Sequence, residues 1–127
     1  MSKSAPDEVP MLPPRPEDDL LARSDLAGYA RVVASNNCFA TLRFYKFLKG
    51  RPKGRGIFAR LGLSRTAVVK INAGTNREAY EGGPLIVEYS GDAHLFVPGY
   101  ELKAYLWWDA QSEAYNSVWW NAVSRVI

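Results

Sequence analysis

The chain has 127 residues, of which 47% are hydrophobic and 23% charged, and its formal net charge is +3. These values are typical of one globular domain with a real core. No apolar run is long enough for a membrane-spanning helix, and the single cysteine, Cys38, excludes an internal disulfide. The first ten residues lack the apolar stretch of a signal peptide. The compartment therefore stays open: cytoplasm as written, or periplasm if an export signal was removed.

Charge is segregated along the chain. Residues 26–77 hold eleven basic residues and no acidic one, whereas residues 78–127 hold seven acidic and two basic residues. Such segregation indicates a dipolar molecule, an anionic partner, or pairing of the two stretches across a sheet.

Residues 1–19 are rich in proline and acidic residues, which predicts a disordered leader before a single β-barrel domain at residues 20–127. The PPRP stretch at residues 13–16 is alternatively a ligand for an aromatic groove on another protein. PEDDLLARSDL, residues 16–26, predicts one short helical turn, because Asp and Glu favour a helix N-terminus.

From residue 26 onward the pattern is that of β-strands. LAGYARVVAS predicts a strand that ends at the turn-forming pair Asn36–Asn37. A second strand follows from Cys38, which we expect to be a small buried hydrophobe. One face of this strand is expected to carry Ala40, Leu42, Phe44 and Leu48, and the other Thr41, Arg43, Tyr45, Phe47 and Lys49.

Further strands are expected in the second half of the chain. GIFARLGL and RTAVVKI predict two short strands, or one bent strand with its kink near Gly62. Residues 72–83 predict a long loop, residues 85–90 a short strand, and residues 100–109 the clearest strand, before a turn and a last strand segment. Five to seven strands predict an all-β fold, a small OB-like Greek-key barrel, with an SH3-like barrel as the alternative.

The order of several short motifs resembles that of netrin-like, TIMP-type OB modules, especially their bacterial exported relatives. The matching residues are Ser24-Asp25-Leu26, Gly28, Leu48-Lys49-Gly50 and Pro98-Gly99-Tyr100. The resemblance covers about residues 20–123 and implies an OB-like barrel. TIMP-type inhibition depends on an N-terminal cysteine and disulfides, which this chain lacks, so the resemblance does not imply protease inhibition.

No set of residues with catalytic spacing is found in the sequence. His94 is the only histidine, and no nucleophile elbow, phosphate-binding loop or calcium loop is present. One cysteine and one histidine cannot build a structural zinc site. We therefore expect no catalytic role, no metal site and no cofactor.

Basic residues on one hairpin suggest binding to nucleic acid. They would neutralise phosphates, while Tyr45 and Phe47 would stack on bases. The alternative interpretation is a soluble turn whose charges block strand pairing. The predicted basic hairpin comprises Arg43, Lys46, Lys49, Arg51, Lys53 and Arg55, with Arg60, Arg65 and Lys70 on the strands that follow.

Aromatic residues of the last hairpin suggest a protein interface instead. If Asp109 pairs with Ala114, one outward face carries Tyr105, Trp107, Val118 and Trp120, and Leu106, Trp108 and Trp119 face the core. Exposed Trp and Tyr clusters mark interfaces, but the leader or the 72–83 loop is alternatively expected to cover this face. We expect a non-catalytic module that binds a protein partner through this aromatic patch and the basic hairpin. Single-stranded nucleic-acid binding is the alternative, and a homo-oligomer is a further hypothesis.

Overall fold

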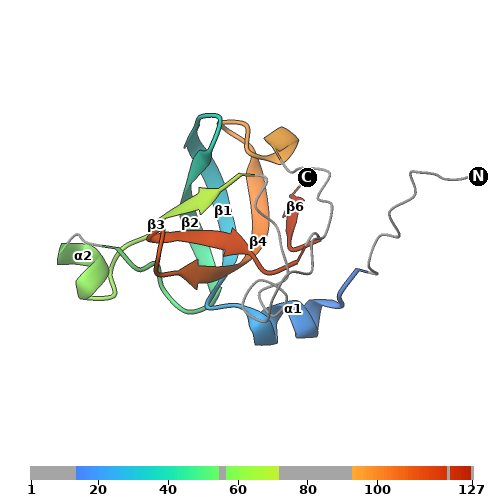
Figure 1. Cartoon of the computed structure of the whole chain (residues 1–127), viewed down its shortest axis with the longest axis horizontal. Coiled ribbons are helices and arrows are strands. Elements are labelled where there is room, and N and C mark those ends of the chain that lie inside the picture. Colours follow the sequence, from blue (N-terminus) through green and yellow to red (C-terminus); the bar gives the residue numbers. More distant parts are fainter. Residues whose placement is uncertain (1–13, 55–56, 72–92, 120, 127) are drawn as a thin grey trace, which may run out of the picture.

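A closed ring of five strands forms the centre of the molecule (Figure 1). The computed structural model describes residues 14–54, 57–71, 93–119 and 121–126. The ring runs in the order β1-β2-β3-β5-β4, and β4 pairs back with β1, while the short strand β6 extends the sheet beside β4. The strands are β1 (Leu26–Ser35), β2 (Phe39–Lys49), β3 (Thr66–Lys70), β4 (Glu101–Asp109), β5 (Ala114–Ser117) and β6 (Val123–Arg125). This architecture confirms the predicted small all-β barrel.

Alternating apolar residues build the barrel interior. Each strand of the ring sends every second side chain inward, as a strand with one buried face must. The largest inward side chains include Phe44 and Tyr115, and Phe96 closes the core from the connection before β4. The smaller ones are Leu26, Ala30, Val32, Ala40, Leu42, Ala67, Val69, Leu102, Ala104 and Leu106.

Irregular pairing between β1 and β2 changes which side chains face inward. Tyr29 pairs with Lys46, but its neighbour Ala30 pairs with Phe44, so one residue of β2 is left over. An extra residue reverses the alternation beyond it. Phe47 therefore packs against the core and stacks on Phe44 at 5.5 Å between ring centroids, whereas Leu48 is exposed. The predicted faces of Phe47 and Leu48 are therefore wrong, whereas Lys49 is exposed as expected.

Two of the expected connections differ from the prediction. Asn36 does form the turn after β1, because its Oδ1 accepts hydrogen bonds from the backbone N–H groups of Cys38 and Phe39, both at 2.8 Å. Cys38 is exposed on this turn, so its expected burial is wrong. GIFARLGL contains the short helix α2 (Ile57–Arg60) in place of a strand. The predicted loop at 72–83 and strand at 85–90 lie outside the described residues, which resume at the 3-10 turn η1 (Ala93–Leu95).

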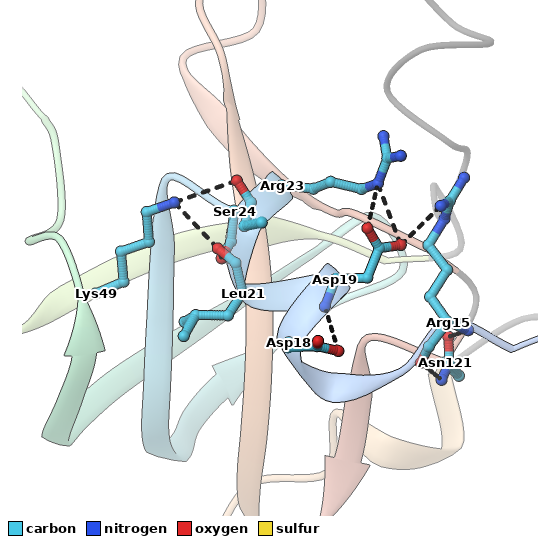
Figure 2. Close-up of polar contacts among 9 residues, drawn as sticks. Arg15, Asp18, Asp19, Leu21, Arg23, Ser24, Lys49 and Asn121 are labelled. Carbon is cyan, nitrogen blue, oxygen red and sulfur yellow. Dashed lines mark hydrogen bonds and ion pairs between the residues drawn. The ribbon is translucent and has the colours of Figure 1, made fainter.

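The predicted helical turn forms α1 (Glu17–Arg23), which packs on the barrel through the buried side chain of Leu20. The expected boundary at residue 20 therefore falls inside a helix, and residues 17–19 of the predicted leader are helical. The first 13 residues of that leader lie outside the described residues. Figure 2 shows Lys49 at the C-terminal end of α1, where its ammonium donates to the carbonyl oxygens of Leu21 and Ala22 at 3.0 and 3.3 Å. A cation at this end satisfies free carbonyls and suits the helix dipole.

Two ion pairs join the basic and acidic stretches of the sequence. Arg31 on β1 contacts Glu101 on β4 at 2.8 Å, and Lys70 on β3 contacts Asp109 on β4 at the same distance. The charge segregation therefore has one structural use, pairing across the barrel. Among the residues described, no helix is long and apolar enough to cross a membrane.

Gly50 ends β2 at a position that only glycine fits. Its φ is 71°, and a Cβ there would overlap the carbonyl oxygen of Asp25. Gly62 has nearly the same φ, 72°, but open space around it. We expect Gly62→Ala to cost about 1–2 kcal/mol, the strain of a left-handed residue, and Gly50→Ala to cost about 1–3 kcal/mol more from overlap. Urea unfolding of both variants measures the difference, and equal losses of stability would contradict the close approach.

Asp109 is buried and accepts hydrogen bonds from Lys70 Nζ at 2.8 Å, Ser112 Oγ at 3.0 Å and the Gln111 N–H at 3.0 Å. The bond from Lys70 outweighs burial and holds the pKa of Asp109 below its ordinary value of 3.8. A carboxyl with a lowered folded-state pKa stabilises the fold above its unfolded-state pKa, and this contribution is lost as pH falls through the folded value. Asp109→Asn should lower the free energy of unfolding at neutral pH by about 1.5–3 kcal/mol.

The same variant should also lose stability less steeply than the natural chain below about pH 4. Chemical denaturation at a series of pH values measures this dependence. Asp18→Asn, a matched change at an exposed carboxyl of α1, serves as the control. Parallel pH profiles for Asp109→Asn and the natural chain would contradict the assignment.

Candidate functional site

An open groove of about 620 Å³ lies on the outer face of the barrel, across β1, β2, the residue before β3 and the start of β4. Three arginines, one carboxylate and one exposed tyrosine give it its chemistry. The lining residues are Arg31, Val33, Arg43, Phe44, Tyr45, Arg65 and Glu101.

Strand register brings the three arginines together. Arg31 on β1 lies directly opposite Arg43 on β2, and Phe44 donates its N–H to the carbonyl oxygen of Arg65 at 2.7 Å. Directly opposed side chains on neighbouring antiparallel strands have Cβ atoms about 4.5–5.5 Å apart. Like charges in this arrangement destabilise a sheet. The three arginines therefore lower the stability of the fold unless an anion lies beside them.

Glu101 supplies part of that negative charge. Its carboxylate accepts from Arg31 Nη2 at 2.8 Å and from the Tyr45 hydroxyl at 3.0 Å. The hydrogen bond from Arg31, followed by that from Tyr45, lowers the pKa of Glu101, so the group stays ionised at neutral pH. No carboxylate of the described residues pairs with Arg43 or Arg65. The groove therefore retains two cations that an anion from outside can reach.

Aromatic rings alternate with cations on this face. Tyr45 is 49% exposed and lies 6.4 Å from Tyr29 between ring centroids. The ammonium groups of Lys46 and Lys103 each lie 5.5 Å from the Tyr29 ring centre. Partial burial, then the hydrogen bond to Glu101, raises the pKa of Tyr45, so its ring stays neutral and available for stacking.

The predicted basic hairpin is divided among several roles. Arg43 alone of its six residues lines the groove. The Lys46 ammonium lies over the Tyr29 ring, and Lys49 caps the C-terminal end of α1. The Arg51 guanidinium stacks on the Phe47 ring at 4.0 Å. Lys53 is exposed, its backbone N–H donating to the Tyr115 hydroxyl at 3.0 Å, and Arg55 lies outside the described residues. The predicted outward position of Phe47 is wrong, because Phe47 packs against the core; of the two predicted stacking residues, only Tyr45 faces outward.

Arg31 is not among the site residues predicted from the sequence, and Arg65 is predicted only on a strand that follows the basic hairpin. The alternation of β1 does put Arg31 outward, which was a usable signal. Its position beside Arg43 depends on the β1–β2 register, which the sequence does not reveal.

The predicted register of the last hairpin is confirmed, because Asp109 pairs with Ala114 and Trp107 with Asn116. The expected exposed aromatic patch is nevertheless wrong. The side chains of Tyr105, Trp107 and Val118 are only 4%, 3% and 1% exposed, and Trp120 lies outside the described residues. These three form a second buried cluster with Leu20, Ala27, Trp119 and Ala122.

Helix α1 and Arg15, two residues before it, cover this second cluster. Leu20 packs into it, and the Arg15 guanidinium lies 4.0 Å from the Trp119 ring centre. Glu17 accepts hydrogen bonds from the Tyr105 hydroxyl and from Lys103. Burial of so much aromatic surface outweighs the cost of ordering one short helix. Trp119 belongs to this cluster and not to the barrel core as expected, because the chain turns beyond β5, where Ala122 N–H donates to Trp119 O at 3.1 Å.

The remaining candidates for chemistry lie apart from one another. Within the residues described, no three His, Cys, Asp or Glu side chains come together as metal ligands. His94 is exposed on η1, and Cys38 is exposed on the turn after β1.

Comparison of the chain with protein-family models, curated proteins and solved structures finds no match in any of the three. The netrin-like resemblance therefore stays a prediction. The function of the protein is inferred from the groove.

The cover over the aromatic cluster gives a measurable expectation. Leu20→Ala should lower the free energy of unfolding by about 2–5 kcal/mol, the usual loss for a buried leucine. It should also raise acrylamide quenching of tryptophan fluorescence, because Trp107 and Trp119 lose their cover. Ala22→Ser, at an exposed position of the same helix, should change neither quantity. Equal quenching in Leu20→Ala and the natural chain would contradict the role of α1 as the cover.

Proposed function

We propose that the protein is a non-catalytic binding module that holds single-stranded nucleic acid along the groove of Arg31, Arg43, Arg65 and Tyr45. The observation that supports this most is the pair of arginines without a described carboxylate partner, beside an exposed aromatic ring. Arginines neutralise phosphates, and an exposed ring stacks on an unpaired base.

The barrel topology supports the same proposal. The five-stranded ring in the order β1-β2-β3-β5-β4 with return to β1, and the parallel pairing of β3 with β5 at Val69 and Tyr115, are compatible with the proposed Greek-key barrel of the OB type. OB barrels bind oligonucleotides on the face of their second and third strands. The groove includes β2 and the residue before β3, beside β1 and the start of β4, so it overlaps part of the face where an OB barrel binds its ligand. The netrin-like resemblance is compatible with this barrel.

The shape of the site favours single strands over duplexes. Tyr45 and Val33 lie on the sheet surface, where an unstacked base can contact them but a paired base cannot. The surrounding sequence, residues 26–77, carries no acid, so the local field attracts a polyanion.

A protein partner remains the alternative, but its aromatic patch is covered by α1 in the described structure. Only the basic face is then left for an acidic protein. Pairing between copies is less favoured, because Arg31–Glu101 and Lys70–Asp109 already use opposite charges within one chain.

Titration with labelled single-stranded DNA and RNA tests the proposal. We expect binding that weakens steeply with salt. Arg43→Ala with Arg65→Ala should reduce the salt slope by about one for each phosphate that the variant no longer neutralises. Tyr45→Ala should weaken binding by about 1–3 kcal/mol, whereas Tyr45→Phe should retain most of the stacking.

Arg125→Ala is the matched control, because this exposed arginine on β6 stacks on Tyr100 at 3.6 Å and does not line the groove. It should leave affinity unchanged. No binding of any oligonucleotide at low salt would reject the proposal. Equal decreases in affinity for Arg125→Ala and Arg43→Ala would mean that binding is a general charge attraction and not a property of the groove.

A further inference from the structure

The connection between β2 and β3 carries three exposed aliphatic side chains. Ile57, Leu61 and Leu63 are 67%, 64% and 62% exposed, the highest values among the large hydrophobic residues described. They lie on and just after α2, which projects from one side of the barrel, on the left in Figure 1, apart from α1. The groove does not include them.

These side chains contribute to neither core cluster. Burying an exposed Leu or Ile side chain fully is worth about 1.5–3 kcal/mol. Scattered exposed hydrophobic residues need no explanation, but three within seven positions of one projecting segment form a patch. A partner that removed them from water would therefore gain binding free energy.

Positive charge surrounds this apolar segment. Arg60 ends α2, Arg51 and Lys53 precede it, and all three are exposed. Between residues 50 and 65 the sequence contains five cations and no acid. Aliphatic residues flanked by cations are typical of segments that lie in the interface of an anionic membrane.

A second copy of the chain fits this segment less well. Of the exposed large hydrophobic residues of β1 and β2, Phe39 and Leu48 are only 39% and 40% exposed, and Val33 and Tyr45 lie in the groove beside Arg31 and Arg43. Docking the segment there would bring arginine against arginine. An anionic bilayer offers acyl chains for the aliphatic residues and phosphates for the cations at once, with no shaped pocket needed.

We propose that α2 and residues 61–63 dock the protein on an anionic lipid surface. Ile57, Leu61 and Leu63 enter the region just below the headgroups, while Arg60 and Lys53 contact lipid phosphates. This surface contact spans no membrane, and it is independent of the nucleic-acid groove because the side chains differ.

Co-sedimentation with vesicles of phosphatidylcholine, with and without phosphatidylglycerol, tests the proposal. We expect binding only to vesicles with phosphatidylglycerol, and a loss of about tenfold or more when Ile57, Leu61 and Leu63 are all changed to Ser, since each buried CH₂ contributes about 0.8 kcal/mol. Leu48→Ser with Val97→Ser, two exposed aliphatic positions outside the segment, should bind like the natural chain. Urea unfolding checks that all variants stay folded.

Insertion itself has a separate measurement. In a Cys38→Ser background, an environment-sensitive dye on Leu61→Cys should shift its emission to the blue with anionic vesicles, whereas the same dye on Val97→Cys should not. Failure of the natural chain to bind anionic vesicles would overturn the proposal. So would equal binding by the triple serine variant, or binding without a dye shift. A dimer in light scattering that the triple variant disperses, without vesicle binding, would assign the segment to a second copy.

Discussion

The double pairing of β1 is the constraint on which the rest of the structure depends. Ala27 lies between Lys49 of β2 and Tyr105 of β4, and this arrangement closes the ring. The ring leaves none of its five strands at a free edge, and among the described strands only the short β6 lies at the margin of the sheet. An outward face or a connection therefore offers a partner more surface than a strand edge does. Helix α1 covers one outward face, the arginine groove occupies another, and the connection through α2 projects from the side of the barrel.

Stability and the proposed binding place opposite demands on the groove. The barrel interior is apolar and closely alternating, but Arg31 and Arg43 oppose each other on neighbouring strands, which a design for stability alone would avoid. The Glu101 carboxylate neutralises Arg31 and holds Tyr45 by a hydrogen bond. No carboxylate of the described residues neutralises Arg43. Sites that break a local rule of stability in this way are typical of functional surfaces.

Local patterns predicted much of the fold. The strict alternation in residues 100–109 predicted β4 and the register of the last hairpin. The turn-forming asparagines after residue 35 predicted the end of β1. Both features depend only on residues that are close in sequence. The irregular pairing after Tyr29 reversed Phe47, and no local signal marks an extra residue in a strand. The prediction that Tyr105 and Trp107 point away from the barrel core is correct. Their burial depends on Leu20, which lies far earlier in the sequence. Likewise, the groove exists only because register aligns Arg31 with Arg43.

Closure through β1 also has a consequence for synthesis of the chain. β1, β2 and β3 leave the ribosome before β4, so the second edge of β1 waits unpaired until residues 101–109 are made. Open edges on a nascent hairpin invite pairing with other copies. Between residues 26 and 77 every charged side chain is basic, so two such unfinished chains repel each other. The first acids after residue 77 are made shortly before β4, and Glu101 and Asp109 come with it. These two carboxylates then pair with Arg31 and Lys70 as the ring closes.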